Sequence, residues 1–192
     1  SVTVFERFLN EFPHSGYSEK VSDYLVETYM NTRSYDAALK SIAKISNPGS
    51  RILEAKQKIL FRLGTQAFAN ANFMDALQYF NRSLELGQYN PEVMADSHYW
   101  RGEVNYRLGN YRDAGWDLRR FLELTTNKHN QEYGLALYNL GYTDFKLKNY
   151  GSALNWFSRF VSEGVNDNKQ VLADAYNRMG DCNFYARKFD DA

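Results

Sequence analysis

Apolar side chains recur every three or four positions along most of the chain, which is the spacing of amphipathic helices. Residues 136–148, which read ALYNLGYTDFKLK, and residues 150–163, which read YGSALNWFSRFVSE, show this pattern clearly. A short turn at Lys148-Asn149 separates the two segments. The pattern therefore predicts an all-α protein built from pairs of helices joined by tight turns.

The predicted helix pairs repeat at a nearly constant interval. Glycines recur at intervals of 38, 39 and 39 residues, at Gly64, Gly102, Gly141 and Gly180. Alanines recur at intervals of 38, 38, 39 and 39 residues, at Ala38, Ala76, Ala114, Ala153 and Ala192. An aromatic residue stands three positions before each alanine, at Tyr35, Phe73, Tyr111, Tyr150 and Phe189. Because small residues let two helix backbones approach closely, we expect each glycine to face the alanine of its partner helix.

This pattern resembles the tetratricopeptide repeat (TPR), whose 34-residue unit carries W-x2-L-G-x2-Y and then A-x3-F. The best matches are Leu60-x2-Leu63-Gly64, Leu137-x2-Leu140-Gly141, Ala76-x3-Phe80 and Ala153-x3-Phe157. The resemblance implies a right-handed α-solenoid of antiparallel helix pairs, a TPR superhelix, with a period here of 38–39 residues.

Three features depart from the TPR pattern. The period is longer than that of the family, and we place the additional residues in the loops between repeats. His98 and Arg101 stand where large apolar residues are expected. The position that usually carries Tyr after the glycine holds Ala67, Asn105, Asp144 and Asn183, and an aromatic residue follows one position later at Phe68, Tyr106, Phe145 and Phe184.

The whole chain, residues 1–192, is expected to be a single TPR array and a fragment of a longer protein. The expected units are the second helix of a preceding repeat at 1–13, repeats at 18–47, 51–87, 92–126 and 130–164, and a partial repeat at 168–192. The sequence FERFLNEFPHS, residues 5–15, also resembles helices of bacterial cell-envelope TPR proteins. That resemblance favours the periplasm or cell envelope over the cytoplasm.

Composition and motifs argue against several functions. Lys+Arg and Asp+Glu are balanced at 23 each without a basic run, so we expect no nucleic-acid partner, and no apolar run is long enough for direct membrane insertion. His14, His98 and His129 have no partner at metal-ligand spacing, and the single Cys182 is expected to be a buried thiol. A phosphate-binding loop and a nucleophile motif are also missing from the sequence. We therefore expect no cofactor, no metal site and no enzymatic activity.

In a TPR superhelix, one stripe of each first helix lines the concave groove. Since each helical residue turns by about 100°, this stripe can be located from the glycine and its leucines. The expected groove residues are Phe61, Phe68, Tyr99, Glu103, Tyr106, Arg107, Tyr138, Tyr142, Phe145, Lys146, Asp181 and Phe184.

Two interpretations of the aromatic residues on this stripe stay open. Phe68, Phe145 and Phe184 can pack against the first helix of a neighbouring repeat, because Phe has no polar atom to present to water. Tyr99, Tyr106, Tyr138 and Tyr142 can instead form a binding surface, because Tyr combines apolar area with a hydroxyl. The aromatic residues of the second helices, Trp116, Trp156, Phe157 and Phe160, are expected to hold repeats together.

The expected function is a non-catalytic protein–protein interaction scaffold that binds a protein or peptide segment in an aromatic-lined concave groove. The alternatives are a carbohydrate-binding surface and a purely structural spacer within a larger envelope protein. The positions of the family's clamp for a C-terminal carboxylate hold Thr65, Glu103, Tyr142 and Asp181, so that ligand is not expected. The uncapped ends, with Phe5, Phe8 and Leu9 at one and Phe189 at the other, predict self-association.

Overall fold

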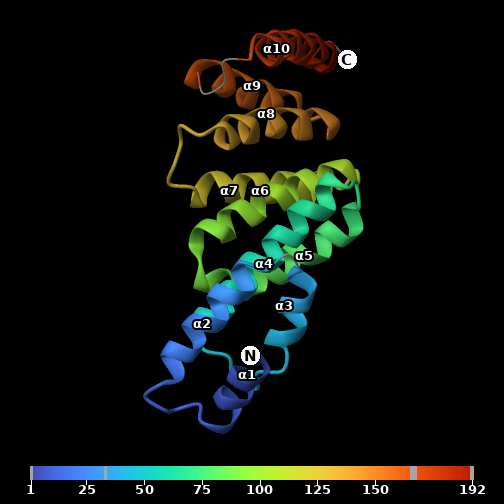
Figure 1. Ribbon diagram of the computed structural model, residues 1–192. Helices are drawn as coiled ribbons and strands as arrows, with labels where there is room; N and C mark the ends of the chain where they lie inside the picture. Colours follow the sequence, from blue (N-terminus) through green and yellow to red (C-terminus); the bar gives the residue numbers. More distant parts are fainter. Residues whose placement is uncertain (1, 33, 165–167, 191–192) are drawn as a thin grey trace. The chain divides into compact units, whose positions relative to one another are not determined.

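The computed structural model describes residues 2–32, 34–164 and 168–190, and the side chains of these ranges up to residue 186 (Figure 1). Every regular element within these ranges is a helix, which confirms the all-α prediction. The helices are α1 (Val2–Glu11), α2 (Ser18–Met30), α3 (Tyr35–Ile42), α4 (Ser50–Ala69), α5 (Phe73–Glu85), the 3-10 helix η1 (Gly87–Tyr89), α6 (Pro91–Arg107), α7 (Tyr111–Leu124), α8 (Gln131–Lys146), α9 (Tyr150–Glu163) and α10 (Lys169–Asp190).

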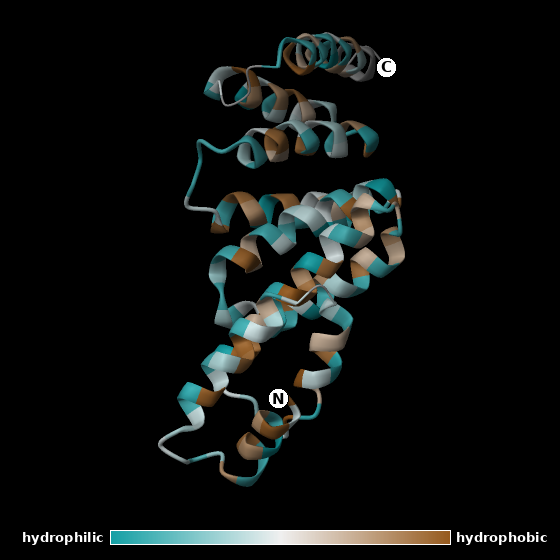
Figure 2. Ribbon diagram, in the orientation of Figure 1, coloured by the Kyte–Doolittle hydropathy of each residue, from teal (hydrophilic) through white to brown (hydrophobic). Residues whose placement is uncertain are grey.

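The chain divides into two compact units, residues 1–97 and residues 98–192, and the division falls inside α6. Adjacent helices pack as pairs within each unit, most extensively α4 with α5 in the first and α8 with α9 in the second. Figure 2 shows that hydrophobic and hydrophilic segments alternate along these helices, as amphipathic packing requires. No helix in the described part of the chain is long and apolar enough to cross a membrane.

The core of the first unit comes from α1 to α4. Leu25 and Ile52 are fully buried, and Leu9 of α1 is buried in the same cluster, with Phe5 and Phe8 partly buried against it. The apolar residues that we expected at this end of the chain are therefore largely covered by packing within the unit. The side chain of Phe189, expected at the other end, lies outside the described residues.

The core of the second unit is aromatic. Phe157 and Phe160 of α9 are completely buried beside Leu137 of α8, as the sequence predicted for the two phenylalanines. Cys182 of α10 is completely buried in the same cluster, and this burial raises the pKa of its thiol to about 11. The buried thiol predicted from the sequence is thus confirmed.

Three of the repeated glycines, Gly64, Gly102 and Gly141, lie closest to aromatic or aliphatic side chains of the partner helix. A Cβ atom at Gly64 would lie 2.6 Å from the ring of Phe80, and one at Gly141 would lie 2.6 Å from the ring of Phe157. At Gly102 the nearest side chain is Leu118, at 2.9 Å. The glycine therefore makes room for the residue four positions after the alanine, and at Gly102 the carbonyl oxygen of Ala114 also lies 3.4 Å from the Cβ position.

The turns α4–α5, α6–α7 and α8–α9 share one backbone conformation. Ala71, Gly109 and Lys148 have positive φ angles of 59°, 80° and 63°. The next residue, Asn149 in the last of these turns, donates its N–H to the carbonyl of Asp144 (2.8 Å), and Lys148 donates to Phe145 (3.0 Å). These two bonds define a Schellman motif, which ends the first helix and reverses the chain. At the position equivalent to Lys148, 39 residues later, the backbone of α10 stays helical, so no second helix starts there.

Candidate functional site

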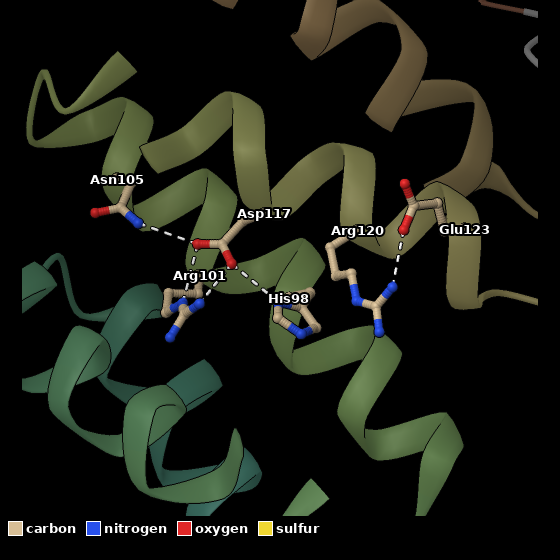
Figure 3. Close-up of polar contacts among 6 residues, drawn as sticks. All are labelled: His98, Arg101, Asn105, Asp117, Arg120 and Glu123. Carbon is tan, nitrogen blue, oxygen red and sulfur yellow. Dashed lines mark hydrogen bonds and ion pairs between the residues drawn. The ribbon is translucent and has the colours of Figure 1, made fainter. Parts of the chain in front are cut away.

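The unusual polar residues of α6 form a buried cluster around Asp117 of α7 (Figure 3). Arg101 donates from Nε and Nη2 to the two carboxylate oxygens (2.9 and 2.7 Å), and Asn105 Nδ2 donates to Oδ2 (3.2 Å). His98 Nδ1 lies 2.9 Å from Oδ1, and the Asp117 side chain is 1% exposed. Both oxygens of the buried Asp117 carboxylate therefore have hydrogen-bond partners. At the positions of His98 and Arg101, these hydrogen bonds take the place of the apolar packing that the repeat pattern predicts.

A second buried carboxylate joins α7, α8 and α9. Asp144 of α8 accepts hydrogen bonds at Oδ2 from Arg119 Nη2 (2.8 Å), Ser152 Oγ (2.6 Å) and Trp156 Nε1 (3.0 Å). Asp144 and Asn105 occupy the position where the TPR pattern carries Tyr. Their side chains form hydrogen bonds to neighbouring helices there. In both clusters the carboxylate itself is buried, at 1% exposure for Asp117 and 3% for Asp144, and joins neighbouring helices.

Two of the predicted groove tyrosines converge on one carboxylate. The hydroxyls of Tyr138 and Tyr142, both on α8, donate to Asp174 Oδ2 of α10, at 2.7 Å for Tyr138. Both rings pack edge-on against Phe157, with centroids 5.9 and 5.4 Å away. Desolvation by burial, followed by the hydrogen bond to Asp174, raises the pKa of both hydroxyls. These tyrosines therefore connect α8 to α10 and are only partly exposed.

Charged and aromatic groups extend from this carboxylate along α10. Arg178 forms ion pairs with Asp181 (2.6 Å) and, more distantly, with Asp174 (3.8 Å). Its guanidinium lies 6.0 Å from the ring centroid of Phe145 on α8. Tyr185 follows Arg178 by seven residues, about two helical turns, with its ring centroid 6.1 Å from that of Phe145. Arg178 is thus held between two carboxylates and an aromatic ring.

Two aromatic residues toward the end of α10 are exposed. Tyr185 stacks on Tyr150 of α9, with centroids 4.9 Å apart, and remains 39% exposed. Phe184 is 55% exposed beside it. We use the name "α8–α10 surface" for Tyr138, Tyr142, Phe145, Asp174, Arg178, Asp181, Phe184 and Tyr185.

Tyr99 does not lie on an exposed surface, which corrects the sequence prediction for this residue. Its side chain is only 5% exposed and packs against Phe121, with ring centroids 5.2 Å apart, and against Trp100 at 5.5 Å. Burial, with nearby Glu103 as the second cause, raises the pKa of the Tyr99 hydroxyl. The turn of about 100° per residue predicts where Tyr99 lies around the axis of α6. It does not predict that Phe121 packs against the ring.

The remaining predicted residues of the second unit differ in exposure. Glu103 accepts a hydrogen bond from Asn139 of α8, and burial raises the pKa of its carboxyl. Tyr106 is partly buried, with its ring centroid 5.4 Å from that of Tyr111. Arg107 and Lys146 are exposed at the ends of α6 and α8.

The predicted residues of the first unit are partly buried between paired helices. The ring of Phe61 lies 6.0 Å from that of Phe80, and the ring of Phe68 lies 5.5 Å from that of Phe73. Both contacts join α4 to α5, so these rings support the pair.

Two further residues differ from the sequence interpretation. Trp116 was expected to hold repeats together, yet it is 57% exposed and rests on His98, with ring centroids 5.4 Å apart. Arg178 was not among the predicted residues. The spacing of Asp174, Arg178 and Asp181 at four and three residues is the signal that could have indicated it, because such pairs meet on one helix face.

The helix pairs, their periodic glycines and their Schellman turns define an α-helical repeat protein. No protein-family model matches the sequence, and no curated protein matches it. Solved structures do match: apo RapI aligns with a TM-score of 0.62 and 21% identity over 91% of this chain. This chain spans 51% of the RapI chain, about half its length.

Two other structures cover similar shares of both chains. MamA aligns with a TM-score of 0.55 and 18% identity, over 92% of this chain and 90% of MamA. A putative kinesin light chain from Podosopora anserina, described as having nearly identical TPR-like repeats, aligns with a TM-score of 0.54 and 8% identity, over 93% of this chain and 91% of its own. The fold is therefore that of the TPR-type helical repeat proteins.

Proposed function

We propose that this protein is a non-catalytic scaffold that binds a segment of another protein at the α8–α10 surface. Helical repeat proteins of the TPR type are in general protein-interaction scaffolds. The observation that carries the proposal is the exposure of Phe184 and Tyr185, at 55% and 39%, beside charged groups already fixed in place. Aromatic residues, Phe and Tyr among them, are enriched in protein interfaces relative to the rest of the surface.

The fixed polar network lowers the cost of binding. Asp174 already accepts hydrogen bonds from two tyrosine hydroxyls, and Arg178 is already paired with Asp181. These side chains have therefore lost most of their conformational freedom before a partner arrives. Phe184 and Tyr185 would supply the apolar contact area, and the Tyr185 hydroxyl would add a polar contact at its edge.

The proposed surface keeps part of the groove predicted from the sequence. Tyr138, Tyr142, Phe145, Asp181 and Phe184 belong to it. Glu103, Tyr106, Arg107 and Lys146 are proposed as flanking positions, where Arg107 and Lys146 can contact an acidic edge of the partner. Tyr99 is excluded because it is buried.

A capture experiment with matched variants of α10 tests this proposal. Wild-type protein is immobilised and proteins bound from the source organism are identified, and the affinity of the main partner is then measured for each variant. Phe184→Ala with Tyr185→Ala is expected to weaken that affinity by about 30-fold or more, because truncating anchor residues costs at least about 2 kcal/mol. Tyr176→Ala is the control, since Tyr176 is 58% exposed on the same helix but lies outside the α8–α10 surface.

The proposal fails if the double variant Phe184→Ala with Tyr185→Ala binds the partner as tightly as the wild type. It also fails if Tyr176→Ala and the double variant lose the same affinity, because the loss would then not belong to this surface. Circular dichroism of the double variant checks that a loss of affinity is not caused by unfolding. Because both side chains are exposed, their truncation should leave the helices folded.

A further inference from the structure

An open cavity of about 300 Å³ lies between α7, the segment after it, the first turn of α8, and α9. Its lining includes three cationic side chains, Arg119, Lys128 and Arg159, together with Trp156 and Tyr133. None of these residues belongs to the α8–α10 surface. The volume is at the lower limit of small-ligand sites, so it suits a single functional group better than a whole helix.

The indole of Trp156 lies close to two guanidinium groups. The guanidinium carbons of Arg119 and Arg159 are 5.7 and 5.2 Å from its ring centroid, so both cations interact with the aromatic ring. Arg119 can lie flat along α7 because residue 115 is glycine: a Cβ atom there would be 2.9 Å from Arg119 Nη1. The two arginines are thus held at fixed positions on the cavity wall.

Existing contacts use only some of the donors on these cations. Arg119 donates to Asp144 through Nη2, and Arg159 donates to Glu163 through Nε and Nη2 and to the Tyr133 hydroxyl through Nη2 (3.3 Å). An arginine carries five N–H donors, so further donors remain on both. Lys128 has no ion pair with any carboxylate among the described residues.

The charges around the cavity leave room for one additional anion. The lining carboxylate Glu123 is already paired with Arg120, at 2.8 Å (Figure 3). Asp144 and Glu163 each pair with one lining arginine. The ammonium group of Lys128 is therefore the charge that these carboxylates do not compensate.

We propose that this cavity, the α7–α9 cavity, binds an oxyanion of the phosphate or carboxylate class carried by a side chain of a protein partner. The oxyanion accepts hydrogen bonds from the remaining donors of Arg119 and Arg159 and forms an ion pair with Lys128. Arginine pairs are well suited to this task because their planar donors match the oxygens of phosphate and carboxylate groups. The α7–α9 cavity would give the scaffold a second contact that recognises charge, independent of the aromatic contact at the α8–α10 surface.

Titration with inorganic phosphate at constant ionic strength tests the site directly. NMR signals of the Trp156 Nε1–H and the Arg159 Nε–H groups are followed in labelled protein. Phosphate is expected to shift both signals with saturation, and Arg159→Gln and Lys128→Gln should each weaken binding at least fivefold. Arg112→Gln is the control, since Arg112 is exposed on α7 but is not among the residues that line the cavity. Its affinity should stay within twofold of the wild type.

Two peptides of equal length then distinguish the sources of the oxyanion. One carries a phosphoserine and the other carries glutamate at the same position. Tighter binding of the phosphopeptide assigns a phosphate, and equal or tighter binding of the glutamate peptide assigns a carboxylate. Phe184→Ala with Tyr185→Ala should leave both affinities unchanged, so failure of the α8–α10 proposal would not affect this result.

The inference is overturned if phosphate causes no saturable shift. It is equally overturned if Arg159→Gln and Arg112→Gln lose affinity to the same extent, because the anion would then respond only to the general charge of the surface.

Discussion

At the scale of single residues, the fold depends on a glycine being present opposite a large side chain. Gly141 and Phe157 illustrate the arrangement, because a Cβ atom at position 141 would lie 2.6 Å from the ring of Phe157. The ring is completely buried, so it has little room to move away. The unfavourable helix propensity of glycine, about 1 kcal/mol relative to alanine, is therefore offset by packing.

Gly141→Ala should consequently destabilise the protein, although alanine is the better helix former. Overpacking of a filled core costs about 1–3 kcal/mol, which exceeds the gain in helix propensity. Gly180→Ala is the matched control: Gly180 stands at the equivalent position of α10, and a Cβ atom there meets no described atom within 4 Å. That substitution should raise the free energy of unfolding by up to about 1 kcal/mol.

Urea unfolding of the two variants, with the wild type as reference, measures both changes. If Gly141→Ala were as stabilising as Gly180→Ala, the account of close glycine–ring packing would be contradicted.

At the scale of the helices, the turn inside each pair decides where the first helix ends. Gly109 adopts a positive φ angle of 80° without any close contact to a would-be Cβ atom, so its role is conformational. Lys148 adopts φ of 63° in the equivalent turn although it carries a side chain. A non-glycine residue in this left-handed region costs about 1–2 kcal/mol.

Opposite substitutions in these two turns should have opposite effects. Lys148→Gly is expected to raise the free energy of unfolding by about 1 kcal/mol, and Gly109→Ala is expected to lower it by a similar amount. Thermal unfolding monitored by circular dichroism checks both variants. Effects of the same sign would show that the turn conformation does not control stability here.

The sequence predicted the helix pairs and their period because local spacing determines both. It also predicted the burial of Phe157, Phe160 and Cys182, since these residues follow the apolar stripe of their own helix. The exposure of Trp116 and the burial of Tyr99 could not be predicted in this way. Whether a side chain is covered depends on which neighbouring helix packs over it, and that contact is not encoded in the spacing of one helix.

The candidate site was predictable only in part for the same reason. The sequence placed Tyr138 and Tyr142 together on one stripe of α8, but it did not indicate their shared hydrogen-bond acceptor, Asp174, which lies 32 residues or more away in the sequence. The polar residues His98 and Arg101 marked a departure from the repeat pattern. Their partner Asp117 became evident only when α6 and α7 were seen packed together.

At the scale of the whole molecule, the chain combines two units that each have their own hydrophobic core. Both proposed contacts with other molecules, the α8–α10 surface and the α7–α9 cavity, lie within the second unit, residues 98–192. The described residues also contain no group of three or more His, Cys, Asp or Glu side chains that could hold a metal ion. The central proposal is that the second unit recognises a protein partner through the α8–α10 surface.

Hydrogen–deuterium exchange of the protein with its captured partner tests this claim most directly. Binding at the proposed surface should slow amide exchange at the end of α8 and along α10, in peptides that cover residues 138–146 and 174–185. Exchange in α2 to α5 should change little, because those helices belong to the first unit. Protection confined to the first unit, with α8 and α10 unchanged, would contradict the account.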